Sequence, residues 1–201
     1  LELDEAHAVR FVHEIRPDFA LLLNVLRDQL DRFGEIDTTA KMLGEIAKNT
    51  TRALVVNRDD PRLVALAEHA KIPAKYFGFA QNLAPLFPTD EQLHGEKITK
   101  NPAPKTRHRA LVELENIDEN EVSFRIENAK FETKMAISGA HNFINASAAI
   151  AFADAILGAK FSAKNAVASV TKVGAAFGRG ENFELGNGQK IVLNLVKNPA
   201  G

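Results

Sequence analysis

The chain has 201 residues, of which 45% are hydrophobic and 25% charged, and its formal net charge is −1. This is the composition of a globular protein with a sizeable core, and the near-zero charge gives no bulk electrostatic reason to expect binding to nucleic acid. Cysteine is absent, which excludes disulfide bonds and thiolate metal sites. No apolar run reaches the roughly 20 residues of a membrane span, so we expect no transmembrane segment and a cytoplasmic location.

The first 79 residues alternate between strand and helix patterns. Apolar runs predict strands at residues 1–3, 19–24, 52–57 and 75–79, and helical spacing predicts helices at residues 5–15, 37–50 and 61–70. Asp37 or Thr38 is the expected N-cap of the second helix. This alternation predicts an α/β fold with a mostly parallel sheet flanked by helices.

The pattern changes after residue 79. Residues 80–108 are proline-rich without a clear period, which predicts an irregular connection or insertion. Alternation with period two then predicts a small antiparallel β subdomain, with strands at 110–115, 121–128 and 130–138. Helical patterns follow at 142–158 and 162–173, and residues 183–196 predict a hairpin that turns at Asn187-Gly188.

Acids and amides follow three of the predicted strands. Asp28 and Asp31 come after residues 19–24, Asn57, Asp59 and Asp60 come after residues 52–57, and Glu2 and Asp4 lie at the first strand. Ligands of open α/β sheets bind beyond the carboxyl ends of the strands, and oxygen ligands suit Mg²⁺ better than zinc. The alternative is that these acids only cap the helices that follow.

Four other side chains are candidates for ligand binding. Asn142 and Asn145 are three residues apart, so on a helix both project from one side and could read a nucleobase edge, although Asn142 could also be a plain N-cap. Arg179 stands between two glycines, in a turn that suits a phosphate contact or is simply solvated. Lys197 follows the last strand and is an exposed lysine by default. No G-x-x-x-x-G-K-[ST] motif is present.

Six segments, in their order along the chain, resemble the central domain of the Mur ligase family. The resemblance is strongest to the MurT-type members, which are the synthetase subunits of lipid II isoglutaminyl synthase. The segments are LELDEA, LLNVLRDQLDRFGEIDTT, VVNRDDP, GAHNFINASAAIAFADA, FGRGENFE and NLVKNPAG. The resemblance implies a P-loop NTPase-like fold without its first strand and P-loop, so we expect a longer protein and an inactive isolated chain. Residues 1–79 and 139–196 would form the ATP-binding domain. Residues 80–138 would replace a zinc-ribbon region, without zinc since cysteine is absent, and residues 197–201 would begin a linker.

The resemblance also implies an activity. MurT-type proteins use ATP and Mg²⁺ to phosphorylate the D-glutamate α-carboxyl of lipid II, and ammonia from a glutamine amidotransferase subunit, GatD, then gives D-isoglutamine. This reaction belongs to peptidoglycan synthesis at the inner face of the cytoplasmic membrane. Two alternatives are an amino-acid-adding Mur or folylpolyglutamate-type ligase and a degenerate nucleotide-binding module without catalysis.

Site residues carry over by position. Glu2 matches the Mg²⁺-binding glutamate, and Asn142 and Asn145 match an H-N-x-x-N motif whose second asparagine, here Asn145, meets adenine. Arg179 matches a nucleotide-contacting arginine, and Lys197 a lysine of the interdomain linker. Asp28 lies in the loop that the resemblance assigns to the ATP and Mg²⁺ edge of the site. The next residue, Gln29, stands where other Mur ligases have a metal-binding histidine.

Overall fold

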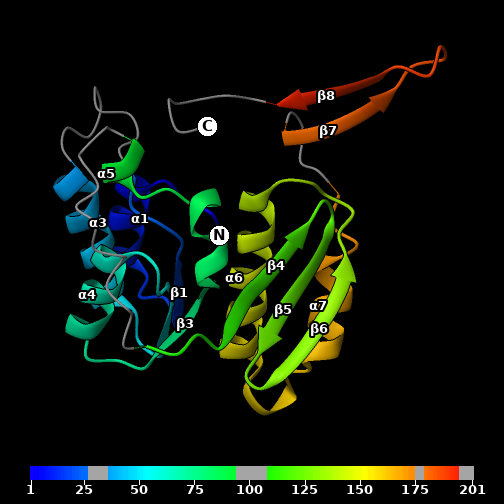
Figure 1. Cartoon of the computed structure of the whole chain (residues 1–201). Coiled ribbons are helices and arrows are strands. Elements are labelled where there is room, and N and C mark those ends of the chain that lie inside the picture. Colours follow the sequence, from blue (N-terminus) through cyan, green and yellow to red (C-terminus); the bar gives the residue numbers. More distant parts are fainter. Residues whose placement is uncertain (27–35, 94–107, 175–178, 195–201) are drawn as a thin grey trace.

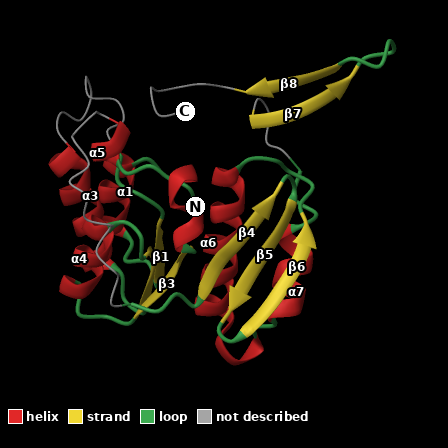
Figure 2. Cartoon of the chain, viewed as in Figure 1, coloured by secondary structure: helices red, strands yellow, loops and turns green. Residues whose placement is uncertain are grey.

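The computed structural model describes residues 1–26, 36–93, 108–174 and 179–194. Helices and strands alternate along most of this length (Figures 1 and 2). In chain order they are α1 (Glu5–Glu14), β1 (Phe19–Leu22), α3 (Ile36–Asn49), β2 (Ala53–Asn57), α4 (Pro61–His69), β3 (Ala74–Phe79), η1 (Gln81–Leu86), α5 (Asp90–Leu93), β4 (Val112–Asp118), β5 (Glu121–Ile126), β6 (Ala129–Lys134), α6 (Ala140–Leu157), η2 (Gly158–Lys160), α7 (Ala163–Val170), β7 (Arg179–Glu184) and β8 (Lys190–Asn194).

Six strands form one sheet in sequence order, from β1 to β6. The first four are parallel to one another, whereas β5 and β6 extend the same sheet with antiparallel pairing. Strands β7 and β8 form a separate antiparallel hairpin. The predicted fold class, a mostly parallel sheet flanked by helices with a small antiparallel part, is therefore confirmed.

Helices cover the parallel strands on both faces. Val55 and Phe77 lie in an apolar cluster with α6 and α7, while Leu54 and Val56 lie in a second cluster with α1, α3 and α4. Strand β2 is buried at four consecutive positions because both of its faces are covered. This three-layered packing, with helices on both faces of the sheet, explains why the sequence of β2 is a continuous apolar run.

Helix α6 is the central helix of one layer. It contacts β1, β2, β3 and β4, and Phe143, Ala148 and Ile150 are almost fully buried. Among the described residues, only Ala140–Lys160 is long and apolar enough to span a membrane, by length and composition alone. The contacts of α6 with four strands account for its apolar character.

Two local predictions at helix starts were wrong. Residues 1–3 are not a strand: Leu1 and Leu3 are exposed, and these residues pair with no strand in the part of the chain that the structure describes. Asp4 caps α1 by accepting the His7 N–H at 2.9 Å. Helix α3 begins at Ile36, so Asp37 lies in its first turn and is not its N-cap. Other expected ends are confirmed: Ser162 caps α7, Gly158 ends α6 at φ 52°, and the hairpin turns at Gly188 with φ 79°.

Candidate functional site

The carboxyl ends of the parallel strands gather the described candidate residues at one edge of the sheet. Strand β2 ends at Asn57 and leads into Asp59 and Asp60, beside the ends of β1 and β3. Strand β6 runs in the same direction as β4 and is followed by α6, so the first turns of α6 also lie at this edge (Figure 1). We call this region the carboxyl edge.

The two asparagines of α6 have different surroundings. Helix α6 begins after Gly139, which has φ 101°, and the Asn142 side chain donates to the Ser138 carbonyl at 2.7 Å. Asn142 is therefore not the N-cap, but it holds the turn that starts the helix. Asn145 is exposed about one turn further on. Asn145 is thus more exposed than Asn142, which is half-buried and uses one amide N–H for Ser138.

Asp60 is engaged in backbone contacts. Its Oδ1 accepts the N–H groups of Arg62 and Leu63 at 2.9 and 3.2 Å, which makes Asp60 the N-cap of α4. Its Oδ2 accepts the Val25 N–H at 2.7 Å. The helix-capping alternative is thus correct for Asp60, and the carboxylate has a second role that the sequence did not indicate.

A chain of charged side chains crosses the sheet below the carboxyl edge. Arg58 passes over β3 to pair with Glu113 of β4, which also pairs with Arg125 of β5. Arg125 Nε in turn donates to Glu115 at 2.7 Å. Arg58 and Glu113 are nearly buried, with side chains 13% and 10% exposed, so each needs the other's charge. We call Arg58, Glu113, Arg125 and Glu115 the charge ladder.

Gly78 makes room for this crossing. A Cβ atom at Gly78 would lie 2.3 Å from Asp59 Oδ2 and 2.9 Å from Cγ and Nε of Arg58. Neither Gly78 nor the charge ladder was expected from the sequence. The signal that could have found them is a lone glycine inside an apolar strand, which often marks the close approach of another group.

Asp59 is held against the end of β3. Its Oδ2 accepts the Phe79 N–H at 2.8 Å, and its Oδ1 lies 3.5 Å from Arg58 Nε. Burial raises the pKa of Asp59 above its ordinary value, although the Phe79 hydrogen bond and the Arg58 charge lower it. Because folding raises the pKa of Asp59, the free energy of unfolding is lower when Asp59 is ionised than when it is protonated.

We expect Asp59→Asn to be more stable than the wild type at neutral pH. The asparagine carbonyl can still accept the Phe79 N–H, while the desolvated charge is removed. The difference in the free energy of unfolding should be absent below the pKa of Asp59 in the unfolded chain, near 3.8. It should grow as the pH rises through the raised pKa of Asp59 in the folded protein. Urea unfolding of both proteins from pH 3.5 to 7.5 measures it, and a difference that shrinks with rising pH would contradict the assignment.

Comparison with known proteins identifies the family. The profile of the Mur ligase middle domain matches residues 1–153. The chain belongs to the Mur ligase family. It is 32% identical to the lipid II isoglutaminyl synthase subunit MurT of Streptococcus pneumoniae, an alignment that covers 100% of this chain and 48% of that protein. The chain spans about half the length of the curated MurT relatives it matches.

Solved structures share the fold. A pseudomurein peptide ligase type C from Methanothermus fervidus matches 95% of this chain and 41% of its own, with a TM-score of 0.70 and 18% identity. The MurF ligase of Thermotoga maritima, solved in complex with ADP, matches 88% of this chain and 35% of its own, with a TM-score of 0.60 and 18% identity. These Mur ligases confirm the architecture described above.

A magnesium site of the Mur ligase type would depend on Glu2 in the described part of the chain. Glu2 is exposed just before the N-terminus of α1, whereas Asp59 and Asp60 already bind backbone N–H groups. Residues 1–26, 36–93, 108–174 and 179–194 contain no group of three or more His, Cys, Asp or Glu that could hold a metal ion. One carboxylate is nevertheless sufficient where substrate phosphates complete the coordination of Mg²⁺, and the assignment of Glu2 stays a prediction.

The structure gives a position for only some of the other predicted site residues. Asp28, Gln29 and Lys197 lie outside the described residues. Arg179 begins β7, where its backbone is in register with Asn194 of β8. The structure therefore brings the first turns of α6 and the loop after β2 to one edge, and leaves the remaining assignments as predictions.

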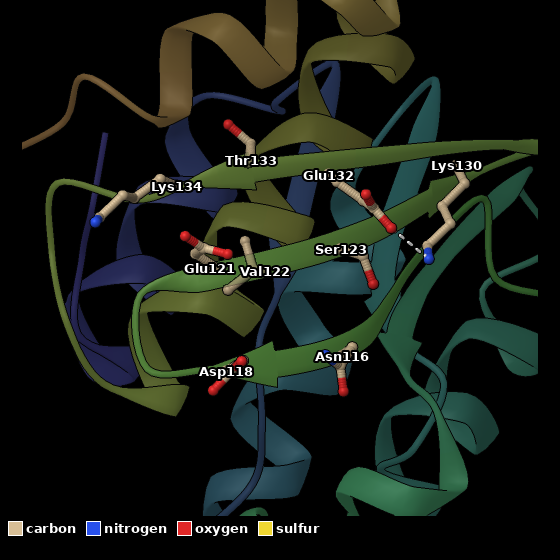
Figure 3. Close-up of a pocket in the computed structure, with 9 residues that line it drawn as sticks. All are labelled: Asn116, Asp118, Glu121, Val122, Ser123, Lys130, Glu132, Thr133 and Lys134. Atoms are coloured by element: carbon tan, nitrogen blue, oxygen red, sulfur yellow. Dashed lines mark ion pairs between the residues drawn. The ribbon is translucent and has the colours of Figure 1, made fainter.

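A hollow of about 500 Å³ lies elsewhere, on the antiparallel strands β4, β5 and β6 (Figure 3). It is lined by side chains of both charges, including Asp118, Lys130, Glu132 and Lys134. Lys130 and Glu132 pair at 2.6 Å, which raises the pKa of Lys130 and lowers that of Glu132. None of the site residues predicted from the sequence lines this hollow.

Proposed function

We propose that the protein containing this chain is an ATP-dependent amide ligase that converts the D-glutamate of lipid II to D-isoglutamine. The observation that carries the proposal is the similarity to MurT over 100% of the chain, at 32% identity. The name of that relative describes a subunit of a glutamine-hydrolysing synthase. We therefore also propose a glutamine amidotransferase subunit as partner, which supplies ammonia.

The proposed chemistry has two steps. The α-carboxylate of D-glutamate attacks the γ-phosphorus of ATP, so that an acyl phosphate forms and ADP leaves. Ammonia then attacks the acyl carbon, the C–N bond forms and inorganic phosphate leaves. A carboxylate is a poor acyl donor, and phosphorylation provides the leaving group that it lacks. Mg²⁺ would neutralise charge on the transferring phosphoryl group.

The residues of this chain would hold the nucleotide. We assign Glu2 to the magnesium ion and Asn145 to the adenine edge, because the Asn145 amide is exposed and offers both a donor and an acceptor. Asn142 would shape the first turn of α6, since its side chain holds Ser138. Arg179, Asp28 and Lys197 remain proposed contacts to ATP or to the reacting groups.

The domain division and the location are part of the same proposal. Residues 1–79 and 139–196 would bind ATP, residues 80–138 would stand in place of the zinc ribbon of relatives, and residues 197–201 would lead to a further domain. The protein would act in the cytoplasm, at the inner face of the membrane that holds lipid II.

The direct test uses the full-length protein with its glutaminase partner. We expect phosphate release to require ATP, glutamine and lipid II with a free D-glutamate α-carboxyl, and mass spectrometry of the product to show replacement of one hydroxyl by an amino group. Lipid II that is already amidated is the matched control and should give no release. Release that depends on an added amino acid would instead indicate an amino-acid-adding ligase, and the absence of any release would indicate a non-catalytic module.

A further inference from the structure

Asp60 uses both oxygens of its carboxylate, in two different parts of the fold. Oδ1 caps α4 through the N–H groups of Arg62 and Leu63, and Oδ2 accepts the N–H of Val25, a residue 35 positions away in the chain. A helix N-cap needs one oxygen, which serine, threonine or asparagine supplies equally well. The bond to Val25 needs the second oxygen, and only a carboxylate has two acceptors and no donor.

The bond to Val25 is placed at the carboxyl edge. Val25 follows the end of β1 by three residues, and Asp60 follows the end of β2 by the same number. Val25 is 2% exposed and packs in the apolar cluster with α1, α3 and α4. Its N–H lies beyond the ladder between β1 and β2, so Asp60 supplies the acceptor that a buried N–H requires.

The loop that carries Asp60 is itself fixed to β3. Asp59 Oδ2 accepts the Phe79 N–H at 2.8 Å, and an Arg58 terminal nitrogen donates to the Phe79 carbonyl at 2.9 Å. Both backbone groups of Phe79 are thus bound by the loop after β2. Through Asp60, the same loop holds the chain that leaves β1.

We propose that Asp60 is a positioning residue for the nucleotide, because its Oδ2 fixes the chain leaving β1 against the loop after β2. Ligands of open α/β sheets bind at this edge, so the spacing of the two chain segments sets the shape of the site. The inference rests on the proposed binding of ATP at the carboxyl edge. It adds a role for Asp60, acting through Val25, beyond that of a helix cap.

Two substitutions separate the cap from the bond to Val25. Asp60→Ser retains one oxygen for the cap and leaves the Val25 N–H without its acceptor. Asp60→Asn also retains the cap, but directs an NH₂ group at the Val25 N–H. Ser162→Ala is the matched control, since it removes the N-cap of α7 without touching the loop after β2.

The test measures ATP binding and amide exchange in the full-length protein. We expect both Asp60 variants to raise the Kd for ATP about tenfold, the factor for one lost hydrogen bond to a charged group, and to accelerate hydrogen exchange in the peptide that contains Val25. Ser162→Ala should lower the melting temperature and leave the Kd unchanged. The proposal is overturned if Asp60→Ser binds ATP and exchanges like the wild type, or if Ser162→Ala weakens ATP binding equally.

These results are distinct from those that test the proposed function. A wild type that binds ATP but releases no phosphate from lipid II refutes the proposed reaction, while a raised Kd in the Asp60 variants still supports the positioning role. A wild type that binds no ATP refutes both.

Discussion

Replacing Gly78 with alanine is expected to lower the free energy of unfolding by about 3 kcal/mol or more. The new Cβ would lie 2.3 Å from Asp59 Oδ2 and 2.9 Å from Arg58 Cγ, well inside van der Waals contact. Neither side chain can move away freely. Asp59 is bound to the Phe79 N–H, and Arg58 is paired with Glu113.

The cost follows from the charges that would be separated. If Arg58 moves off β3, the Glu113 carboxylate keeps Arg125 but loses its nearly buried partner. Removing one partner of a buried ion pair typically costs about 3–5 kcal/mol, because the remaining charge stays desolvated. The clash of the added methyl group adds to this cost.

Urea unfolding of Gly78→Ala and the wild type measures the difference. Gly174→Ala is the matched control, since no heavy atom of the described residues, apart from its chain neighbours, lies within 4 Å of the position of its Cβ. We expect Gly174→Ala to stay within about 0.5 kcal/mol of the wild type. A Gly78→Ala protein that is equally stable would mean that Arg58 and Asp59 do not need the space above β3.

Replacing Glu2 with alanine is expected to reduce phosphate release by the full-length protein by about 100-fold or more. This prediction rests on the proposed function. The resemblance to Mur ligases assigns Glu2 to Mg²⁺, whereas Asp59 and Asp60 are engaged with backbone N–H groups. Loss of that ligand removes charge compensation from the phosphoryl group during transfer.

The Glu2 experiment needs a control for charge and for folding. Glu14→Ala removes an exposed glutamate at the other end of α1 and should retain wild-type release. We expect the Glu2→Ala protein to keep the melting temperature of the wild type, because Glu2 is exposed. Raising the Mg²⁺ concentration should restore part of the activity. Wild-type turnover in Glu2→Ala would remove our assignment of the metal ligand.

Local sequence patterns predicted most of the secondary structure. The apolar run of β2, the proline at the start of α4 and the Asn187-Gly188 turn each act within a few residues of the chain, so they can be read without the fold. The exception at residues 1–3 has a non-local cause. A strand needs a neighbouring strand to pair with, and these exposed residues pair with none among the described residues.

The candidate site could be predicted only in part. The sequence indicated that the loop with Asn57, Asp59 and Asp60 lies at a ligand-binding edge, and it marked Asn142 and Asn145 as candidate nucleobase contacts without placing them at that edge. The resemblance marked Asn145 as the residue that meets adenine, and only the structure showed that Asn142 bonds to the Ser138 carbonyl. The sequence also did not reveal how the two aspartates are used, because their partners include Val25 and Phe79, which are distant in the chain.

The sequence by itself determined the α/β class, the parallel strands, most helix ends and the resemblance to Mur ligases, because these depend on hydrophobic period, local capping and the order of motifs. The tertiary structure decided which charges meet. Arg58 reaches Glu113 only because parallel pairing places Gly78 beside Glu113, and Asp60 reaches Val25 only because β1 lies next to β2. Contacts between groups 35 to 55 residues apart in the chain depend on strand register, and that register is set by the packing of the whole sheet.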